Sequence, residues 1–166
     1  MNQPQESETL ENHEADGDQY LTFCLADEHY GVDILRVQEI RGWEAVTRVP
    51  TAPGYVKGVL NLRGAIVPIY DLRLKFAMPV APYDKQTVVV VMRVRSGGEE
   101  RSMGVVVDAV SDVLVVREPS VVRTPDFGAR LPTEAIRGLV NDGETMVMLL
   151  DVDQLIEDEA GPLAAA

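Results

Sequence analysis

Few residues in this chain are suited to nucleophilic chemistry. The sequence contains one cysteine, Cys24, and two histidines, His13 and His29. A catalytic Cys or Ser needs a base within reach and a third group that orients the base. Cys24 and His29 could meet across a hairpin, but we favour a packing role for Cys24 against a neighbouring layer. The sequence therefore predicts no catalytic residue and no enzyme activity.

Metal and cofactor sites are also not predicted. A zinc site needs three or four Cys, His or carboxylate ligands at suitable spacing, and the sequence has no such cluster. Asp151 and Asp153 could hold a hard cation, yet Asp151 fits the cap of a helix better. Asp108 and Asp112 fit turns at a strand junction. Neither glycine-rich phosphate-binding motif is present, so we expect no nucleotide.

Four other residues are candidates for recognition rather than catalysis. Arg63 precedes Gly64 in a tight strand connection, where its guanidinium could engage carboxylates or amides. Val37 and Glu39 lie on a stretch with helical spacing, and Glu39 there would ordinarily be a solvated residue. Trp43, the only tryptophan, fits either an interface anchor or a partly buried residue.

Short strands must position these residues. Leu21, Phe23 and Leu25 alternate with polar or small residues, which is typical of a strand with one buried face. The alternation continues over residues 30–34. The spacing of Leu35, Val37 and Ile40 then predicts one or two helical turns, capped by Asp33 and ended near Gly42.

Later segments also predict strands. The β-branched runs at 87–94 and 103–116 are typical of strands buried on both faces. Pro68 places its strand at an edge or a bulge, because proline cannot donate to a ladder. Turns are predicted at Gly97–Gly98 and Asn141–Gly143, and a short helix is predicted after Asp151.

An internal repeat organises these strands. The segment from Gly58 to Leu72 aligns without a gap on Gly138 to Val152, at an offset of 80 residues. A second match aligns residues 31–40 on 104–113, at an offset of 73. In this alignment Arg63 falls on Gly143, so the repeat itself does not require an arginine. We predict two copies of a five-stranded all-β unit, each closed into a small barrel.

The net charge of −12 is concentrated at the two ends. Residues 1–18 contain six acidic residues and no base, and Glu157, Asp158 and Glu159 add three more. We interpret 1–18 and 158–166 as solvated tails. Because the bases are scattered, nucleic-acid binding is not predicted. The single cysteine, the apolar runs too short for a bilayer and the polar N-terminus favour a cytoplasmic location.

Three segments resemble the CheW family of bacterial chemotaxis coupling proteins. They are YGVDILRVQEIRGW, VKGVLNLRGAIVPIYDLRLKF and GVVVDAVSDVL, and the resemblance covers about residues 19–157. It implies an all-β fold of two five-stranded SH3-like barrels that share a hydrophobic core. We place the barrels at roughly 19–84 and 85–157, with or without exchange of strands.

The resemblance also implies a function and two partners. It implies a non-enzymatic adaptor that joins the cytoplasmic tips of methyl-accepting chemotaxis receptors to the regulatory domain of the histidine kinase CheA. In the family, the receptor contact involves positions that fall here at Val37, Glu39 and Arg63. It assigns no individual residue to the kinase contact. The chain would be cytoplasmic and recruited to receptor arrays at the membrane.

Two alternatives stay open at this point. One is a coupling or regulatory module of another chemosensory pathway, either a CheW paralogue or a domain derived from CheV or CheA. A chain of 166 residues has no room for the further domains of CheV or CheA. The other is a hydrolase on a small β-barrel, which the shortage of histidines and nucleophiles disfavours.

Overall fold

The computed structural model describes residues 17–117, 131 and 133–156. Its strands are β1 (Asp18–Leu25), β2 (Glu28–Asp33), β3 (Val37–Gly42), β4 (Val56–Leu62), β5 (Ala65–Asp71), β6 (Val88–Ser96), β7 (Glu99–Val107), β8 (Ala109–Val116), β9 (Ile136–Asp142) and β10 (Thr145–Leu150). Its helices are short: η1 (Ile34–Arg36), α2 (Leu72–Lys75), η3 (Thr133–Ala135) and α3 (Val152–Leu155). The all-β prediction is confirmed. Most of the two predicted tails lies outside the described residues, although Asp18 already belongs to β1.

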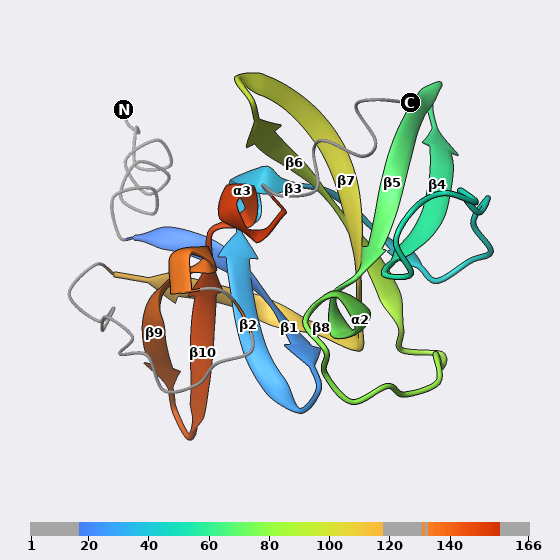
Figure 1. The fold of residues 1–166 in the computed structure, drawn as a ribbon. Coiled ribbons are helices and arrows are strands. Elements are labelled where there is room, and N and C mark those ends of the chain that lie inside the picture. The colour runs from blue at the N-terminus through green and yellow to red at the C-terminus, as the bar shows by residue number, and fades with distance from the viewer. Residues whose placement is uncertain (1–16, 118–130, 132, 157–166) are drawn as a thin grey trace, which may run out of the picture.

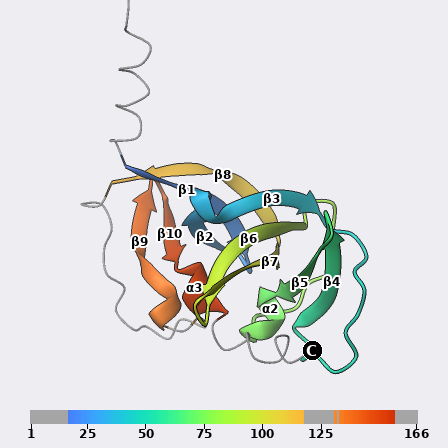
Figure 2. The same ribbon diagram turned by 90° about the horizontal axis from the view of Figure 1, so that it is seen from above.

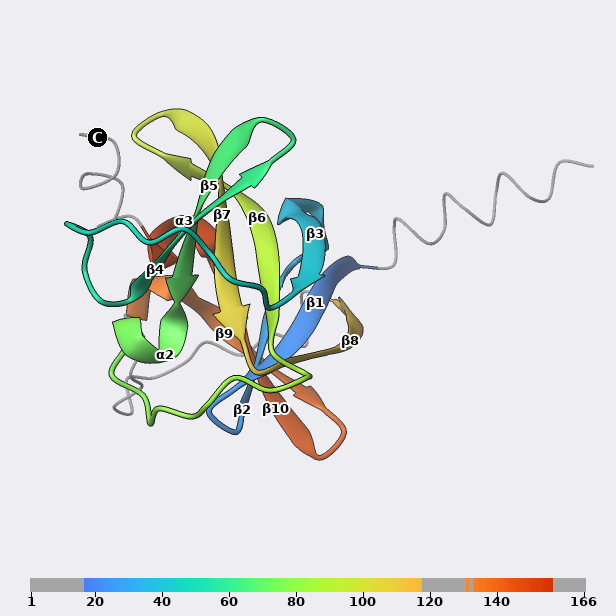
Figure 3. The same cartoon turned by 90° about the vertical axis from the view of Figure 1, so that its right-hand side faces the viewer.

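The strands form two curled sheets of five strands each (Figures 1 and 2). Sheet A has the order β8-β1-β2-β10-β9, and sheet B has the order β3-β6-β7-β5-β4. Sheet B is thus built from one continuous stretch of chain, whereas sheet A combines both ends of the domain. The hairpins β4–β5 and β9–β10 point in opposite directions in Figure 3.

The boundary predicted near residue 84 does not separate the two sheets. The first half supplies the β1–β2 hairpin to sheet A, and the second half supplies the β6–β7 hairpin to sheet B. The chain crosses between the sheets at two short links: Asp108 alone lies between β7 and β8, and η1 alone lies between β2 and β3.

Strand registers confirm the internal repeat. Gly58 pairs with Ile69 in the β4–β5 hairpin, and Gly138 pairs with Leu149 at the equivalent place in β9–β10. The parallel contacts also correspond, because Ile69 pairs with Gly104 and Leu149 pairs with Gly31. The repeat is therefore a repeat of structure as well as of sequence.

The hydrophobic residues form one shared core and one smaller cluster inside each sheet. The shared core takes residues from both sheets, including Phe23, Tyr30, Met92 and Val105. A second cluster around Ile69 lies within sheet B, and a third around Leu149 lies within sheet A. The prediction of two units around a common core is confirmed.

Sheet B closes on itself through a bridge beyond β3. Thr47 exchanges two backbone hydrogen bonds with Val59, at 3.1 and 2.8 Å. The neighbouring Gly58 has φ of 148°, and a Cβ there would lie 2.2 Å from the Thr47 carbonyl oxygen. Glycine is needed at this position because any side chain would push Thr47 away and open the barrel.

Three local predictions need correction. Residues 37–42 form strand β3, and only residues 34–36 are helical, with Asp33 accepting from Leu35 N–H as predicted. The strand with Pro68 lies between β4 and β7, so of the two predicted positions the edge is wrong. The register of the β4–β5 pair shifts just beyond Pro68, as at a bulge, and pairing with β7 begins only at Ile69. Strand β8 is largely exposed, because it pairs with β1 and lies at an end of sheet A.

Other local predictions are confirmed. The turns at Gly97–Gly98 and around Gly143 join antiparallel strands, and these glycines have positive φ. Asp151 caps α3 and accepts a hydrogen bond from Asp153 N–H. No helix in the described ranges has the length and apolar character needed to span a membrane.

Candidate functional site

Arg63 lies at the tip of the β4–β5 hairpin in an unfavourable backbone conformation. Its φ is 54°, and that of Gly64 is 89°. The Asn61 side chain fixes the turn by accepting a 3.0 Å hydrogen bond from Gly64 N–H. The Arg63 side chain is 89% exposed, so its guanidinium projects from the surface as predicted.

Glu39 lies close to Arg63 although 24 residues separate them. Arg63 Nη2 donates to Glu39 Oε2 at 3.2 Å, and Arg41 Nη1 donates to Glu39 Oε1 at 3.0 Å. Arg41 also contacts Glu44 at 3.0 Å. Hydrogen bonds to Glu39 and Glu44 raise the pKa of Arg41 above its ordinary value. Arg63 is thus at the exposed end of a network of alternating charges, and Glu39 is held between two arginines.

Curling of sheet B brings these two residues together. Strands β3 and β4 are the first and last in the sheet order, and the Thr47–Val59 bridge draws their ends towards each other. Glu39 is only 23% exposed, which is low for a surface glutamate. This partial burial differs from the full solvation that is ordinary for a glutamate at such a position.

Val37 lies at the other end of β3, outside the charged network. It is half-buried, pairs with Met92 and packs against the shared core. Its N–H ends η1 by donating to the Ile34 carbonyl. The strand register shifts between Val37 and Glu39. The structure thus brings Glu39 and Arg63 into contact and places Val37 where the chain enters sheet B.

Exposed apolar side chains belong to the same elements, and the sequence patterns did not predict their exposure. Leu35 in η1 is 86% exposed, Ile40 in β3 is 44% exposed and Ile66 in β5 is 64% exposed. Ile40 alternates with Glu39 and Arg41 along β3 and so faces away from the charged network, whereas Ile66 lies on the same hairpin as Arg63. Ile66 and its repeat equivalent Met146 are both exposed, so the alignment contained a signal for this position.

Trp43 is not an exposed anchor. It is half-buried, packs against the sheet B cluster and makes an edge contact with Tyr83, with ring centroids 4.6 Å apart. The Tyr83 hydroxyl donates to Asp71. Burial, together with this hydrogen bond, raises the pKa of Tyr83. Of the two interpretations of Trp43, the partly buried one is confirmed.

Cys24 and His29 do meet across the β1–β2 hairpin. Cys24 Sγ lies 3.5 Å from His29 Nδ1 and 3.7 Å from Ser111 Oγ. Within the described part of the chain, the imidazole has no carboxylate partner that would orient it as a base. Among the same residues, no three His, Cys, Asp or Glu side chains are grouped as they would be around a metal ion.

Comparison with known proteins agrees with this architecture. The family model for the CheW-like domain matches residues 19–160. The chemotaxis protein CheW of Klebsiella aerogenes is 47% identical over 143 residues, covering 86% of this chain and 84% of that protein. The CheW of Rhizobium meliloti is 36% identical, covering 86% and 90%.

The chain belongs to the CheW family.

A solved structure of a CheW protein supports the same conclusion. The crystal structure of the scaffolding protein TtCheW from Thermoanaerobacter tengcongensis matches with a TM-score of 0.75 and 28% identity. The match covers 85% of this chain and 88% of that one. The SH3-like two-barrel fold and the role of chemotaxis adaptor implied by the resemblance are thereby confirmed.

Proposed function

We propose that this chain is a non-enzymatic adaptor that couples methyl-accepting chemotaxis receptors to the histidine kinase CheA. Membership of the CheW family supports the adaptor role. Charged and apolar side chains exposed on β3 and the β4–β5 hairpin support recognition rather than catalysis. The Cys24–His29 pair has no orienting carboxylate among the described residues, which makes it a poor nucleophilic centre.

The receptor surface is proposed to include Val37, Glu39 and Arg63. The backbone at Arg63 is the observation that carries this proposal. The equivalent turn of the other barrel has Gly143, with φ of 69°, at the position of Arg63. A left-handed conformation is unfavourable for arginine, and such strain concentrates at functional positions. Arginine at this position is best explained by a role of its side chain.

The charge network gives the proposed contact its chemistry. Glu39 orients the Arg63 side chain through one Nη atom, which leaves other N–H groups of the guanidinium directed to solvent. A fork of this kind suits carboxylates and side-chain amides on a receptor helix. Ile66, exposed on the same hairpin, would add an apolar contact.

The kinase would bind elsewhere on the molecule. CheA is proposed to contact the barrel ends through its regulatory domain, and we assign no residue to this contact. The adaptor would work in the cytoplasm, recruited to arrays by membrane receptors. Two separate surfaces would let one adaptor hold both partners at once.

A charge reversal tests this proposal. Arg63→Glu should weaken binding to a receptor-tip fragment at least tenfold, measured by isothermal titration. Binding to the CheA regulatory domain should stay within a few-fold. Lys85→Glu, at another exposed position, makes the same change in charge and should affect neither. Equal losses for both partners with an unchanged thermal melt would contradict the separate surfaces, and a collapsed melt would make Arg63 structural.

A further inference from the structure

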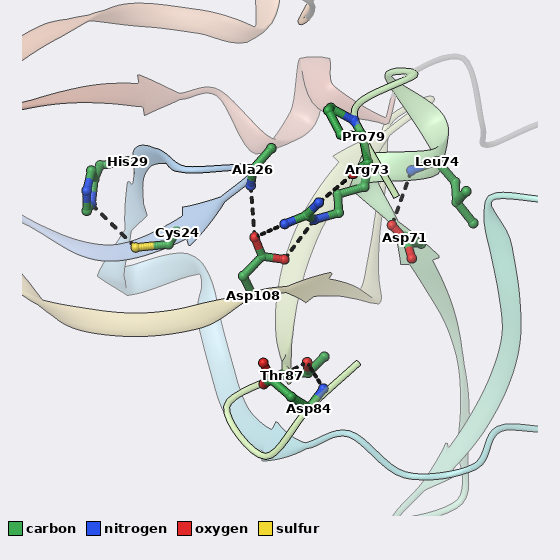
Figure 4. A network of polar contacts seen from close by, with 10 residues as sticks. All are labelled: Cys24, Ala26, His29, Asp71, Arg73, Leu74, Pro79, Asp84, Thr87 and Asp108. Carbon is green, nitrogen blue, oxygen red and sulfur yellow. Dashed lines mark hydrogen bonds and ion pairs between the residues drawn. The ribbon is translucent and has the colours of Figure 1, made fainter. Parts of the chain in front are cut away.

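An ion pair links the two sheets at the crossover from β7 to β8 (Figure 4). Arg73 of α2 donates from Nε to Asp108 Oδ1 at 2.9 Å and from Nη2 to Oδ2. Asp108 is the single residue between β7 and β8, and its Oδ2 also accepts from Ala26 N–H in the β1–β2 turn at 2.8 Å. The hydrogen bonds to Asp108 raise the pKa of Arg73.

A second ion pair lies at the other crossover, from β2 to β3. Arg36, the last residue of η1, donates to both carboxylate oxygens of Asp153 in α3, at 2.9 and 2.8 Å. Asp153 also accepts from Arg95 N–H of β6 at 2.7 Å. Burial opposes its ionisation, but the hydrogen bonds from Arg36 and Arg95 prevail and lower the pKa of Asp153.

The two ion pairs occupy equivalent places in the repeat with their charges reversed. Arg73 aligns with Asp153 at the offset of 80, and both lie in the helix after the second hairpin of their repeat. Arg36 aligns one residue from Asp108 at the offset of 73, and both lie at a crossover. One pair thus has arginine on the helix, and the other has arginine at the crossover.

The repeat also creates a competing pairing. Strands β5 and β10 each pair in parallel with the second strand of a first hairpin, β7 or β2, in equivalent registers. The β9–β10 hairpin could therefore dock on β7 instead of β2, and β4–β5 on β2 instead of β7. Asp153 would then face Asp108, and Arg73 would face Arg36, which like-charge repulsion disfavours.

Chain entropy makes this competition serious for sheet A. Arg36 and Asp153 are 117 residues apart, whereas Arg73 and Asp108 are 35 apart. Asp153 lies much nearer in the sequence to Asp108 than to Arg36, and loop-closure entropy favours the shorter connection. The native pairing in sheet A thus needs a feature that rejects the nearer strand.

We propose that the reversed charges of the Arg73–Asp108 and Arg36–Asp153 ion pairs direct each second hairpin to its native neighbour. Each pair attracts the correct partner and repels the equivalent residue of the other repeat. The Asp108 carboxylate also accepts from Ala26 N–H in sheet A, and the Asp153 carboxylate accepts from Arg95 N–H in sheet B, so correct docking fixes the sheets to each other. Discrimination of this kind combines an attractive element with a repulsive one.

Charge swaps separate this role from simple stabilisation. The variant Arg73→Asp/Asp108→Arg keeps an opposite pair at both native places, but it also gives opposite pairs in the competing arrangement. The variant Arg36→Asp/Asp153→Arg does the same. Combining all four substitutions reverses both pairs and restores the repulsion. The four-fold variant should have the lowest melting temperature, because it loses the backbone hydrogen bonds of both carboxylates.

Refolding from denaturant, followed by two-dimensional NMR and size-exclusion chromatography, measures the outcome. Wild type and the four-fold variant should each refold to one monomeric species. Each double variant should refold at least several-fold more slowly or leave a second population. The milder Arg73→Gln/Asp108→Asn removes the repulsion while keeping a carbonyl acceptor for Ala26, and it should show the same defect more weakly. Clean refolding of the double and mild variants, or equal heterogeneity in the four-fold variant, would overturn the proposal.

Discussion

Replacing Arg63 by glycine should separate binding from stability at one position. Arg63 has φ of 54°, and its repeat equivalent Gly143 has φ of 69°. The left-handed conformation costs a non-glycine residue roughly 1–2 kcal/mol, which Arg63→Gly would recover. Greater freedom of glycine in the unfolded chain takes back about 0.4–1 kcal/mol. Losing the exposed pair with Glu39 costs about 0–1 kcal/mol. The free energy of unfolding should therefore lie between about 1 kcal/mol below and about 1.6 kcal/mol above that of wild type.

Receptor binding should respond very differently to Arg63→Gly. Removing one partner of a desolvated charged contact typically costs about 2–5 kcal/mol, and about 1.4 kcal/mol is tenfold in affinity. Isothermal titration against a receptor-tip fragment should show at least a tenfold loss. A thermal melt should shift by no more than about 6 °C.

Gly143→Arg is the matched control for this change. A Cβ at Gly143 would meet no atom within 4 Å, so the cost is conformational and should be roughly 1 kcal/mol. Receptor affinity should not change. Wild-type affinity in Arg63→Gly would remove Arg63 from the proposed contact, and a loss of several kcal/mol in stability would refute the argument from its backbone.

Three further predictions concern the fold. Gly58→Ala should destabilise the protein by about 1–3 kcal/mol, because its Cβ would overlap the Thr47 backbone. The control Gly42→Ala has open space around it and should cost less than about 1 kcal/mol. Equal urea midpoints for the two variants would contradict the barrel closure. Asp153→Asn should lower stability at pH 7 and should reduce the loss of stability on acidification. The reason is that the lowered pKa of Asp153 stabilises the folded state above the ordinary carboxyl range, and this contribution disappears as pH falls through the folded-state pKa. Urea midpoints that fell equally in wild type and variant between pH 7 and 3 would rule this out. Cutting the chain near Asp84 should leave neither half folded, since each sheet contains strands from both halves. A well-dispersed NMR spectrum from either half would contradict this prediction.

The sequence predicted the parts of the fold that depend on local patterns. The alternating residue types in β1 and the β-branched runs of β6 and β7 correctly indicated strands, and the continuous burial in β6 and β7 fits strands covered on both faces. The gap-free repeat predicted two equivalent hairpins with the same register. Asp33 and Asp151 were recognisable as caps since capping requires only neighbouring residues.

Features set by long-range pairing could not be predicted in the same way. The spacing of Leu35, Val37 and Ile40 fits a helix, but pairing of residues 37–42 with β6 makes them a strand. The low exposure of Glu39 depends on sheet curvature and on Arg41 and Arg63, which no periodicity records. The exchange of hairpins depends on which strands pair in each sheet, and no local pattern in the sequence records that pairing.

Simultaneous binding of two partners is the central claim, and analytical ultracentrifugation tests it most directly. The full chain would be mixed with a receptor-tip fragment and the CheA regulatory domain, each labelled with a different dye. Both dyes should sediment together in one complex only when the chain is present. Arg63→Glu should remove the receptor dye from that complex and leave the kinase dye in place. Two binary complexes without a ternary one would contradict the account, as would binding to neither partner.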